Sequence, residues 1–187
     1  QLLSRTDSLG STVEYTYQQQ NLVSKATQGN RKVSYGYDEM ERPKRVSALR
    51  TDYGAMSGDY VENSYSYAND RLTGIGHNGM TYGFEYNRFG QGTKTTIGTQ
   101  ALMTNSYGAK NGLLQRSTYG NGTYVDNVYD KLERLTARKY NGVVKHEWVY
   151  DNSGRLAIER DLENSRYYYY TYDMLGRLWD LRTTDNS

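Results

Sequence analysis

Aromatic and polar residues alternate in short segments along the whole chain. In Tyr15-Thr16-Tyr17 two rings flank a polar residue, and the order of a ring, a variable residue and a tyrosine recurs as far as Tyr172. Side chains two residues apart lie on one face of a β-strand, so each triplet predicts a strand with both rings on one face. We call the second tyrosine the anchor; two copies keep it and lose the first ring. The anchors are Tyr17, Tyr37, Tyr67, Tyr86, Tyr107, Tyr129, Tyr150 and Tyr172.

The anchors are evenly spaced. Successive intervals are 20, 30, 19, 21, 22, 21 and 22 residues, which indicates about eight repeats of 19–22 residues. The long interval contains about ten extra residues at 51–60, polar and glycine-rich, which predict a loop inserted at a hairpin tip. In the interval of 19, one residue is missing directly after Tyr67. Residues 1–187 are therefore predicted to form a single repeat array.

A tight-turn signal follows the anchors. Its fullest copies read Tyr150-Asp-Asn-Ser-Gly-Arg-Leu156 and Tyr172-Asp-Met-Leu-Gly-Arg-Leu178. The aspartate can accept a hydrogen bond from the backbone two residues on, and glycine can adopt positive φ. Glutamate takes the glycine position in two copies, and Asn111 is expected to adopt positive φ in a third. The predicted turn residues are Asp38, Asp130, Asp151, Gly154, Asp173 and Gly176.

A second turn is predicted half a repeat later. Asn-Gly favours two-residue hairpin turns, in which both central residues have positive φ. The sites are Gly29-Asn30, Asn78-Gly79, Asn121-Gly122, Asn141-Gly142, Glu163-Asn164 and Asp185-Asn186. Residues 1–7 resemble a strand that follows an anchor turn, with a turn at 8–10. The chain is thus predicted to be all-β, about eight antiparallel hairpins and 17 strands, in a long sheet that twists and coils. Anchor rings of consecutive hairpins are expected to stack into ladders.

Composition narrows the function classes. The chain has 21 Tyr, 19 Gly, one Pro and no Cys. Disulfides and thiolate metal sites are excluded, and a core must use phenol rings. A net charge of +2, with both signs interspersed, does not indicate nucleic-acid binding, and no apolar run could span a membrane. The chain begins at Gln1 without a signal peptide, which suggests a piece of a longer protein.

The repeated Tyr-x-Tyr-Asp-x-x-Gly-Arg-Leu, with Gly112-Leu-Leu-Gln-Arg-Ser-Thr-Tyr-Gly-Asn-Gly-Thr123, resembles the YD-repeat or Rhs-repeat family over essentially the whole chain. The resemblance implies a ribbon of hairpins that spirals into a hollow shell. Bacterial members are polymorphic toxins and parts of insecticidal toxin complexes, whose shell encloses a toxic C-terminal domain; animal teneurins use a similar shell in adhesion. The self-cleavage region with which family shells usually end is absent from this sequence.

Residues that suggest other chemistry are interpreted structurally. His77 and His146 lie near hairpin turns and are expected to face solvent. The turn aspartates could ligate calcium, but each has a local backbone donor, and no Gly-x-Ser-x-Gly motif indicates a serine nucleophile. Tyr167–Tyr172 is expected to be a strand with rings on both faces, and Asn121-Gly-Thr123 a turn rather than a glycosylation site. No catalytic, cofactor-binding or metal-binding residue is assigned, and no cofactor is expected.

Two function classes remain open. In the first, the chain is a non-catalytic segment of a secreted bacterial shell that encapsulates a C-terminal toxin or effector, and its partners are that cargo and the other repeats of the parent chain. In the second, it is an extracellular or cell-surface adhesion or carbohydrate-binding module, resembling glucan-binding hairpins that form cages of Trp and Tyr. Only Trp148 and Trp179 are present, and neither follows the repeat. Self-association through exposed strand edges is expected for a shell segment.

Overall fold

The computed structural model describes residues 1–18, 22–50 and 60–185, which form seventeen strands of one sheet and contain no helix. The predicted all-β fold and strand number are confirmed. The strands are β1 (Ser4–Thr6), β2 (Thr12–Tyr17), β3 (Val23–Gln28), β4 (Arg31–Tyr37), β5 (Pro43–Arg50), β6 (Tyr60–Ala68), β7 (Arg71–His77), β8 (Met80–Tyr86), β9 (Gly92–Ile97), β10 (Gln100–Tyr107), β11 (Leu114–Tyr119), β12 (Tyr124–Tyr129), β13 (Leu135–Tyr140), β14 (Val143–Tyr150), β15 (Leu156–Asp161), β16 (Arg166–Tyr172) and β17 (Leu178–Asp185).

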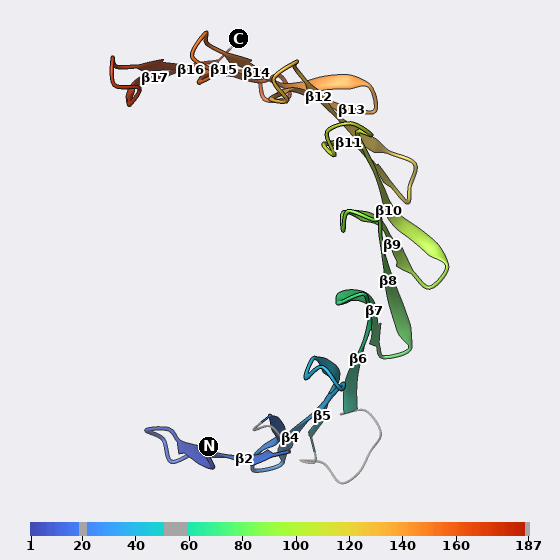
Figure 1. The fold of residues 1–187 in the computed structure, drawn as a ribbon. Helices are drawn as coiled ribbons and strands as arrows, with labels where there is room; N and C mark the ends of the chain where they lie inside the picture. Colours follow the sequence, from blue (N-terminus) through green and yellow to red (C-terminus); the bar gives the residue numbers. More distant parts are fainter. Residues whose placement is uncertain (19–21, 51–59, 186–187) are drawn as a thin grey trace. The chain divides into compact units, whose positions relative to one another are not determined.

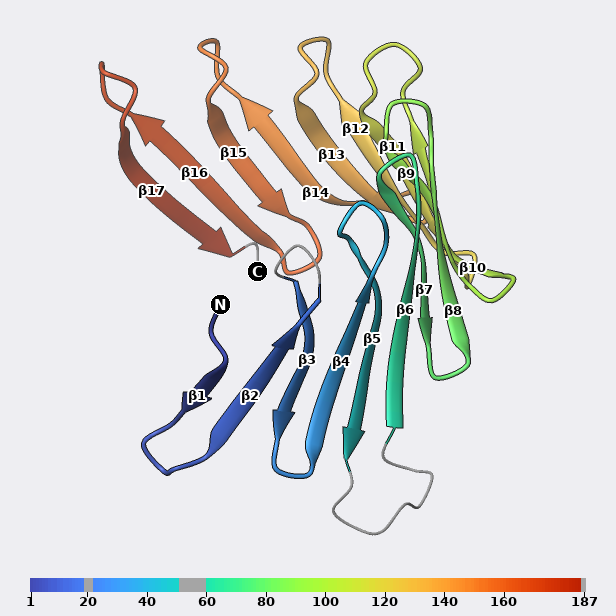
Figure 2. The same ribbon diagram turned by 60° about the horizontal axis from the view of Figure 1, so that its bottom comes forward.

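The chain divides into two units, and Figure 1 shows their strands coloured along the sequence. Unit 1 comprises residues Gln1–Tyr86 and Thr95–Gln100, and unit 2 comprises Asn87–Lys94 and Ala101–Ser187. Within each unit consecutive strands pair antiparallel, from β1·β2 to β7·β8 and from β10·β11 to β16·β17. Figure 2 shows these strands side by side in chain order. Turns therefore alternate between the two ends of the strands, and within each unit all the turns that follow an anchor lie at the same end.

The anchors mark where strands end. Seven of the eight even-numbered strands from β2 to β16 end at an anchor, and β6 continues one residue past Tyr67. We call the turn after an anchor the anchor turn and the other the far turn. The predicted insertion falls in the chain between β5, which ends at Arg50, and β6, which begins at Tyr60. Residues 51–59 themselves lie outside the described residues.

The sheet has almost no hydrophobic core. Among the described residues, Val125, 9% exposed, is the only large apolar side chain that is buried. The accessible surface is 13443 Å², whereas a compact monomer of 21.5 kDa would expose about 9,200 Å². A sheet this thin cannot depend on burial against a second layer, so contacts between neighbouring hairpins must hold it.

Anchor turns share one hydrogen-bond pattern, clearest after Tyr150. The Asp151 amide donates to the carbonyl of Arg155 (2.8 Å), and the Gly154 amide donates to the carbonyl of Asp151 (2.9 Å). One carboxylate oxygen of Asp151 accepts the amides of Ser153 and Arg155, both at 2.9 Å. Gly154 adopts φ 82°, and Gly176 adopts φ 78° in the equivalent place. The aspartate thus caps two backbone donors that the short turn leaves unpaired.

A β-bulge accompanies the anchor, which the sequence analysis did not anticipate. Between β14 and β15, Val149 pairs with Ile158 and Tyr150 with Leu156, so Ala157 is the extra residue. The strand register shifts in the same way directly before six other anchors: Tyr17, Tyr37, Tyr67, Tyr107, Tyr129 and Tyr172. A bulge bends its strand and increases the local twist, so the repeats with a bulge bend at the same end of their strands.

Two of the described anchor turns differ in length from the turn after Tyr150. After Tyr67 the turn has only two residues, Asn69 and Asp70, both at positive φ (49° and 58°), as the missing residue requires. After Tyr107 the turn is one residue longer, because the amide of Gly108 donates to Leu113 (2.8 Å). The expectation that Asn111 adopts positive φ is wrong: the longer turn moves that conformation to Gly112, at φ 67°.

The far turns are less uniform than predicted. Asn78-Gly79 and Asn141-Gly142 have positive φ at both residues, as two-residue hairpin turns require. At Asn121-Gly122 only Gly122 has positive φ, because the Asn121 side chain accepts the amide of Thr123 (3.0 Å) instead. At the turn containing Glu163-Asn164 the positive φ falls on Ser165 (55°).

Replacing Glu133 by glycine should stabilise the chain. Glu133 and Glu41 adopt φ 64° and 62° at the position that glycine holds in the fuller copies. A left-handed conformation costs an L-residue roughly 1–2 kcal/mol, and glycine avoids this cost. Glycine also gives the unfolded chain more conformational entropy, which offsets part of the gain in stability. Glu133→Gly should therefore raise the free energy of unfolding in urea by about 0.5–1 kcal/mol. Glu133→Ala keeps the strain and is the control; an equal gain from alanine would show that backbone strain is not the cause.

Candidate functional site along the anchor turns

Every anchor hydroxyl donates a hydrogen bond to the backbone of the preceding repeat. The acceptor is the carbonyl of the first or second residue after the preceding anchor turn, or its equivalent near the N-terminus. The pairs are Tyr17–Leu2 (2.6 Å), Tyr37–Val23 (3.0 Å), Tyr67–Pro43 (2.8 Å), Tyr86–Leu72 (2.8 Å), Tyr107–Gly92 (2.8 Å), Tyr129–Leu114 (2.9 Å), Tyr150–Leu135 (2.9 Å) and Tyr172–Leu156 (2.8 Å). In six of these pairs the acceptor residue lies beside a β-bulge. The anchors therefore connect each hairpin to the preceding one.

An arginine from the preceding anchor turn covers many of the anchor rings. The guanidinium of Arg134 lies 4.5 Å from the ring centre of Tyr150, and Arg155 lies 4.5 Å from that of Tyr172. In unit 1, Arg42 lies over Tyr67 at 4.4 Å, and Arg71 is near Tyr86 at 5.9 Å. The expectation of directly stacked anchor rings is wrong for these four, because a guanidinium, not another anchor ring, is the group that lies over each ring. In the described part of the chain, the rings that stack are His146 and Trp148.

The same arginines pair with the turn aspartates. The Arg155 Nε and the Asp151 carboxylate are 2.8 Å apart, and equivalent pairs join Asp38 to Arg42, Asp130 to Arg134 and Asp173 to Arg177. The aspartate caps the turn and forms an ion pair with the arginine. At Arg42, Arg134 and Arg155 the guanidinium also lies over the ring of the next anchor. Each such repeat is therefore connected to the next by Asp, Arg and Tyr in series.

In the two copies that lack the first ring, an asparagine stands in its place and donates a hydrogen bond to the preceding repeat. Asn105 Nδ2 donates to the carbonyl of Gly92 (3.0 Å), which also accepts the Tyr107 hydroxyl. Asn127 Nδ2 donates to the carbonyl of Leu114 (3.1 Å), which also accepts the Tyr129 hydroxyl. The asparagine replaces packing by the lost ring with a second hydrogen bond to the same carbonyl.

Hydrogen bonding within the anchor turns lowers the pKa of their aspartates from the usual 3.8. For Asp130 the main cause is the side-chain hydrogen bond from Arg134. For Asp151 and Asp173 it is the backbone amide of the turn arginine, followed by desolvation in the opposite direction at Asp151 and by the arginine side chain at Asp173. For Asp38 burial raises the pKa, and hydrogen bonds from Arg42 and Met40 outweigh it.

These pKa directions predict acid sensitivity. A carboxylate whose folded pKa lies below its unfolded value stabilises the fold above the unfolded pKa, and that contribution is lost as the pH falls through the folded pKa. The melting temperature should therefore be flat from pH 7 to about 5 and should fall below about pH 4, near the unfolded value. Asp130→Asn retains the capping oxygen, as Asn87 does naturally, and should flatten part of the fall. An identical profile in this variant would contradict a role for the Asp130 carboxylate.

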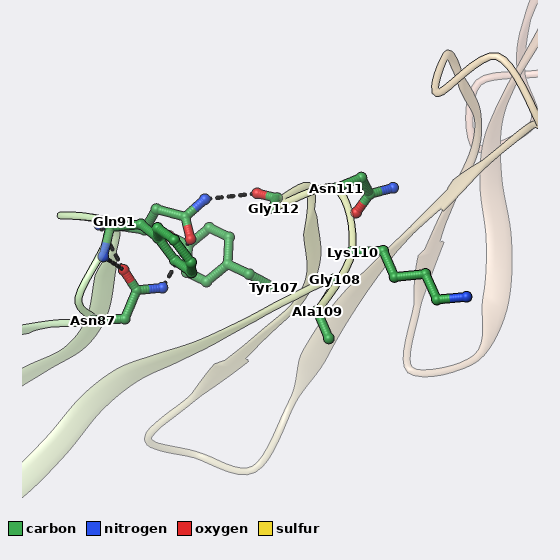
Figure 3. A pocket seen from close by; sticks show the side chains of 9 residues that line it. Asn87, Gln91, Tyr107, Gly108, Ala109, Lys110, Asn111 and Gly112 are labelled. Carbon is green, nitrogen blue, oxygen red and sulfur yellow. Dashed lines mark hydrogen bonds between the residues drawn. The ribbon is translucent and has the colours of Figure 1, made fainter.

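A pocket of about 400 Å³ lies between two anchor turns of unit 2, beside the anchor Tyr107 (Figure 3). Asn87 and Gln91 occupy the places of the turn Asp and Arg, and their side chains bond at 2.8 Å. The Asn87 oxygen accepts the amides of Phe89 (2.9 Å) and Gln91 (3.1 Å), so the turn itself is preserved. Gln91 Nε2 reaches the next turn and donates to the carbonyl of Gly112 (2.6 Å). An amide pair thus replaces the ion pair at this turn.

A second pocket of unit 2, of about 480 Å³, adjoins the anchor Tyr129. Its lining includes Tyr129, Arg116 and Leu113, and Leu113 directly precedes β11 where other copies have arginine. At both Tyr107 and Tyr129, a pocket therefore lies beside an anchor whose preceding turn lacks the arginine.

The remaining candidates from the sequence occupy ordinary structural positions. His77 shares a short contact with Asn63 across the strand pair (2.6 Å), and His146 stacks on Trp148. The segment Tyr167–Tyr172 lies in β16, where Tyr170 donates to Glu159 (3.1 Å) and burial followed by that contact raises the pKa of Tyr170. In the described ranges no group of His, Cys, Asp or Glu could hold a metal ion. None of the described segments is a helix long and apolar enough to cross a membrane.

Comparison with known proteins bears on the fold. No family model matches the sequence, and no curated protein matches it significantly. The crystal structure of TcdB2-TccC3-Cdc42 matches 96% of this chain at 14% identity with a TM-score of 0.58, and the Photorhabdus luminescens Tc holotoxin pore matches 98% at 12% identity with a TM-score of 0.68. The fold matches a segment of a β-sheet shell. The chain spans only about a tenth of those chains, 12% and 10% of their respective lengths.

Sequence reasoning located the anchors and their turns but missed the partners that join them. Arginine recurs five residues after an anchor, at Arg42, Arg134, Arg155 and Arg177. That recurrence was visible, and its pairing with an aspartate four residues earlier could have been predicted. Its position over the next ring could not, because the bulge that brings the two repeats into that register leaves no separate sequence signal.

Proposed function

We propose that this chain is a non-catalytic structural segment of a YD/Rhs shell, which encapsulates a C-terminal toxin or effector of a larger secreted bacterial protein. The observation that carries the proposal is the hydrogen bond from every anchor to the preceding repeat. A contact repeated at each hairpin extends a wall in one direction. It provides no site where substrate groups converge.

The likeness to Tc toxin structures and the resemblance of the repeat to the YD family support the same conclusion from different directions. The thin sheet supports it too. A wall one strand thick leaves both faces available, one to solvent and one to a cargo, and it uses little chain per unit of enclosed surface. The expected partners are the other repeats of the parent chain and the enclosed polypeptide, in the extracellular space.

Protease protection of the segment that follows the repeats in the intact parent protein tests this function. An enclosed cargo should survive trypsin at concentrations that digest it within minutes after denaturation. Replacing both Tyr150 and Tyr172 by alanine should open the wall and make the cargo digestible, whereas Tyr140→Phe, at a tyrosine outside the anchor set, should not. Equal digestion of the cargo in the native and denatured parent would contradict encapsulation.

The carbohydrate-binding alternative predicts a different result. A self-sufficient glycan-binding module should be a monomer by light scattering, and its tyrosine fluorescence should change saturably with cell-wall glycans. That pair of results, together with an unprotected C-terminal segment, would replace the shell proposal with the adhesion one.

A further inference from the structure

The ring face of an anchor is a guanidinium-binding surface within this molecule. In unit 2, Arg134 and Arg155 each lie 4.5 Å from the centre of the next anchor ring, Tyr150 and Tyr172. The contact combines attraction between cation and ring with stacking of two flat groups, which arginine makes better than lysine. The repeat therefore shows directly which side chain suits this position.

At Tyr107 the position beside the ring belongs to a shorter side chain. Gln91 stands where arginine stands in the fuller copies, and its amide is committed to Asn87 and to the carbonyl of Gly112. The glutamine side chain lacks the extra length and planar breadth of a guanidinium. The pocket of about 400 Å³ between the two turns, with Tyr107 in its wall, is the space that remains.

The polarity of the pocket suits a planar hydrogen-bond donor. It is lined by the side-chain amides of Asn87, Gln91 and Asn111, the rings of Phe89 and Tyr107 and the backbone of a glycine-rich turn. The Asn87 oxygen already accepts two backbone amides, whereas the Gln91 and Asn111 oxygens each accept one hydrogen bond and keep a second lone pair. The one charged residue in the wall is Lys110, and Figure 3 shows its amino group pointing away from Asn87 and Gln91. No carboxylate lines the pocket, so an internal arginine there would lack the ion pair of the other turns.

We propose that the pocket beside Tyr107 binds an arginine side chain of a partner polypeptide, stacked on the Tyr107 ring. The partner supplies in trans the group that the other copies supply from their own turn. The partner must carry an exposed arginine in an extended or loop segment, and that segment must contact unit 2 at the strand ends that carry the anchor turns. Encapsulation is not required for this contact, because an enclosed chain or an external one could provide the arginine.

The test is an NMR titration of the 187-residue chain with arginine amide, with lysine amide and a neutral disaccharide as comparisons. Arginine amide should shift the Tyr107 ring resonances saturably in the millimolar range, which is typical of a single exposed cation–ring contact. Lysine amide should bind at least about threefold more weakly, because it cannot stack. The disaccharide should leave the resonances unchanged.

Two variants separate the site from general charge effects. Gln91→Arg should fill the pocket from within and weaken arginine amide binding by at least about fivefold, whereas Gln100→Arg adds the same charge outside the pocket and should not. Gln91→Glu is nearly isosteric and should tighten binding by about three- to tenfold, because the guanidinium gains a carboxylate partner. Its amide spectrum shows whether the fold is retained.

Absence of saturable shifts at Tyr107, or equal binding by Gln91→Arg and the unmodified chain, would overturn the proposal. So would a saturable response to the disaccharide without one to arginine amide, which would instead make the pocket a sugar subsite. None of these readouts involves a cargo, so failure here leaves the shell proposal standing, and loss of protease protection leaves the arginine site standing.

Discussion

Replacing Tyr150 by alanine should lower the free energy of unfolding by roughly 2–4 kcal/mol. The substitution removes a half-buried ring, the hydrogen bond from its hydroxyl to the carbonyl of Leu135 (2.9 Å) and the surface that Arg134 covers. In a globular protein the neighbouring layer would share such a loss. In this thin sheet each anchor is a principal link to the preceding hairpin, and the loss falls on that junction.

A matched pair of phenylalanine variants separates the hydroxyl from the ring. Tyr150→Phe keeps the ring under Arg134 and removes only the donor, so it should cost about 1 kcal/mol. Tyr140→Phe changes a tyrosine outside the anchor set and should stay within about 0.5 kcal/mol of the unmodified chain. Urea unfolding followed by tyrosine fluorescence measures all three. If Tyr150→Phe proved as stable as the unmodified chain, the hydrogen bond would not be what makes the anchor a tyrosine.

Replacing Gly120 by alanine should destabilise the chain by about 1–3 kcal/mol. A methyl group on Gly120 would lie 2.4 Å from the carbonyl oxygen of Ala101, and backbone cannot yield as a flexible side chain can. The Gly120 amide also donates to the carbonyl of Leu102 (2.8 Å), which fixes the two segments together. The steric cost therefore adds to strain on a hydrogen bond between the two arms of the hairpin that β10 and β11 form.

The control for Gly120 is another glycine with open space around it. Gly92 does not have positive φ, and a methyl group built on it meets nothing within 4 Å. Gly92→Ala should therefore change stability by less than about 0.5 kcal/mol in the same urea experiment. Similar losses for the two alanine variants would show that the clash with Ala101 is not the cause.

The fold was largely predictable because the sequence repeats. One strand pattern seen eight times gave the position of each anchor and the number of strands, and the short interval after Tyr67 correctly predicted a shorter turn. One departure came where an anchor turn differed in length from the others. Asn111 was assigned positive φ by counting from the anchor, and the longer turn gave that conformation to Gly112.

The candidate site was less predictable for a physical reason. Its contacts join residues of different repeats, and their register depends on a bulge beside each anchor. Nothing in Ala157 distinguishes it as the extra residue, and nothing in Leu156 shows that its carbonyl accepts the hydroxyl of Tyr172 on the neighbouring strand β16. The pocket at Tyr107 has no sequence signal of its own, because it is defined by the arginine that other copies place beside the next ring.

The anchor hydrogen bonds also bear on how the chain acquires its structure. Seven of them join residues only 14 to 16 positions apart, and the bond of Tyr67, across the insertion, joins residues 24 apart. All-β proteins usually fold slowly because distant segments must meet first. Here loop closure is short at every step, and each completed hairpin is a template for the next. Folding can therefore proceed in sequence order as the chain emerges from a ribosome.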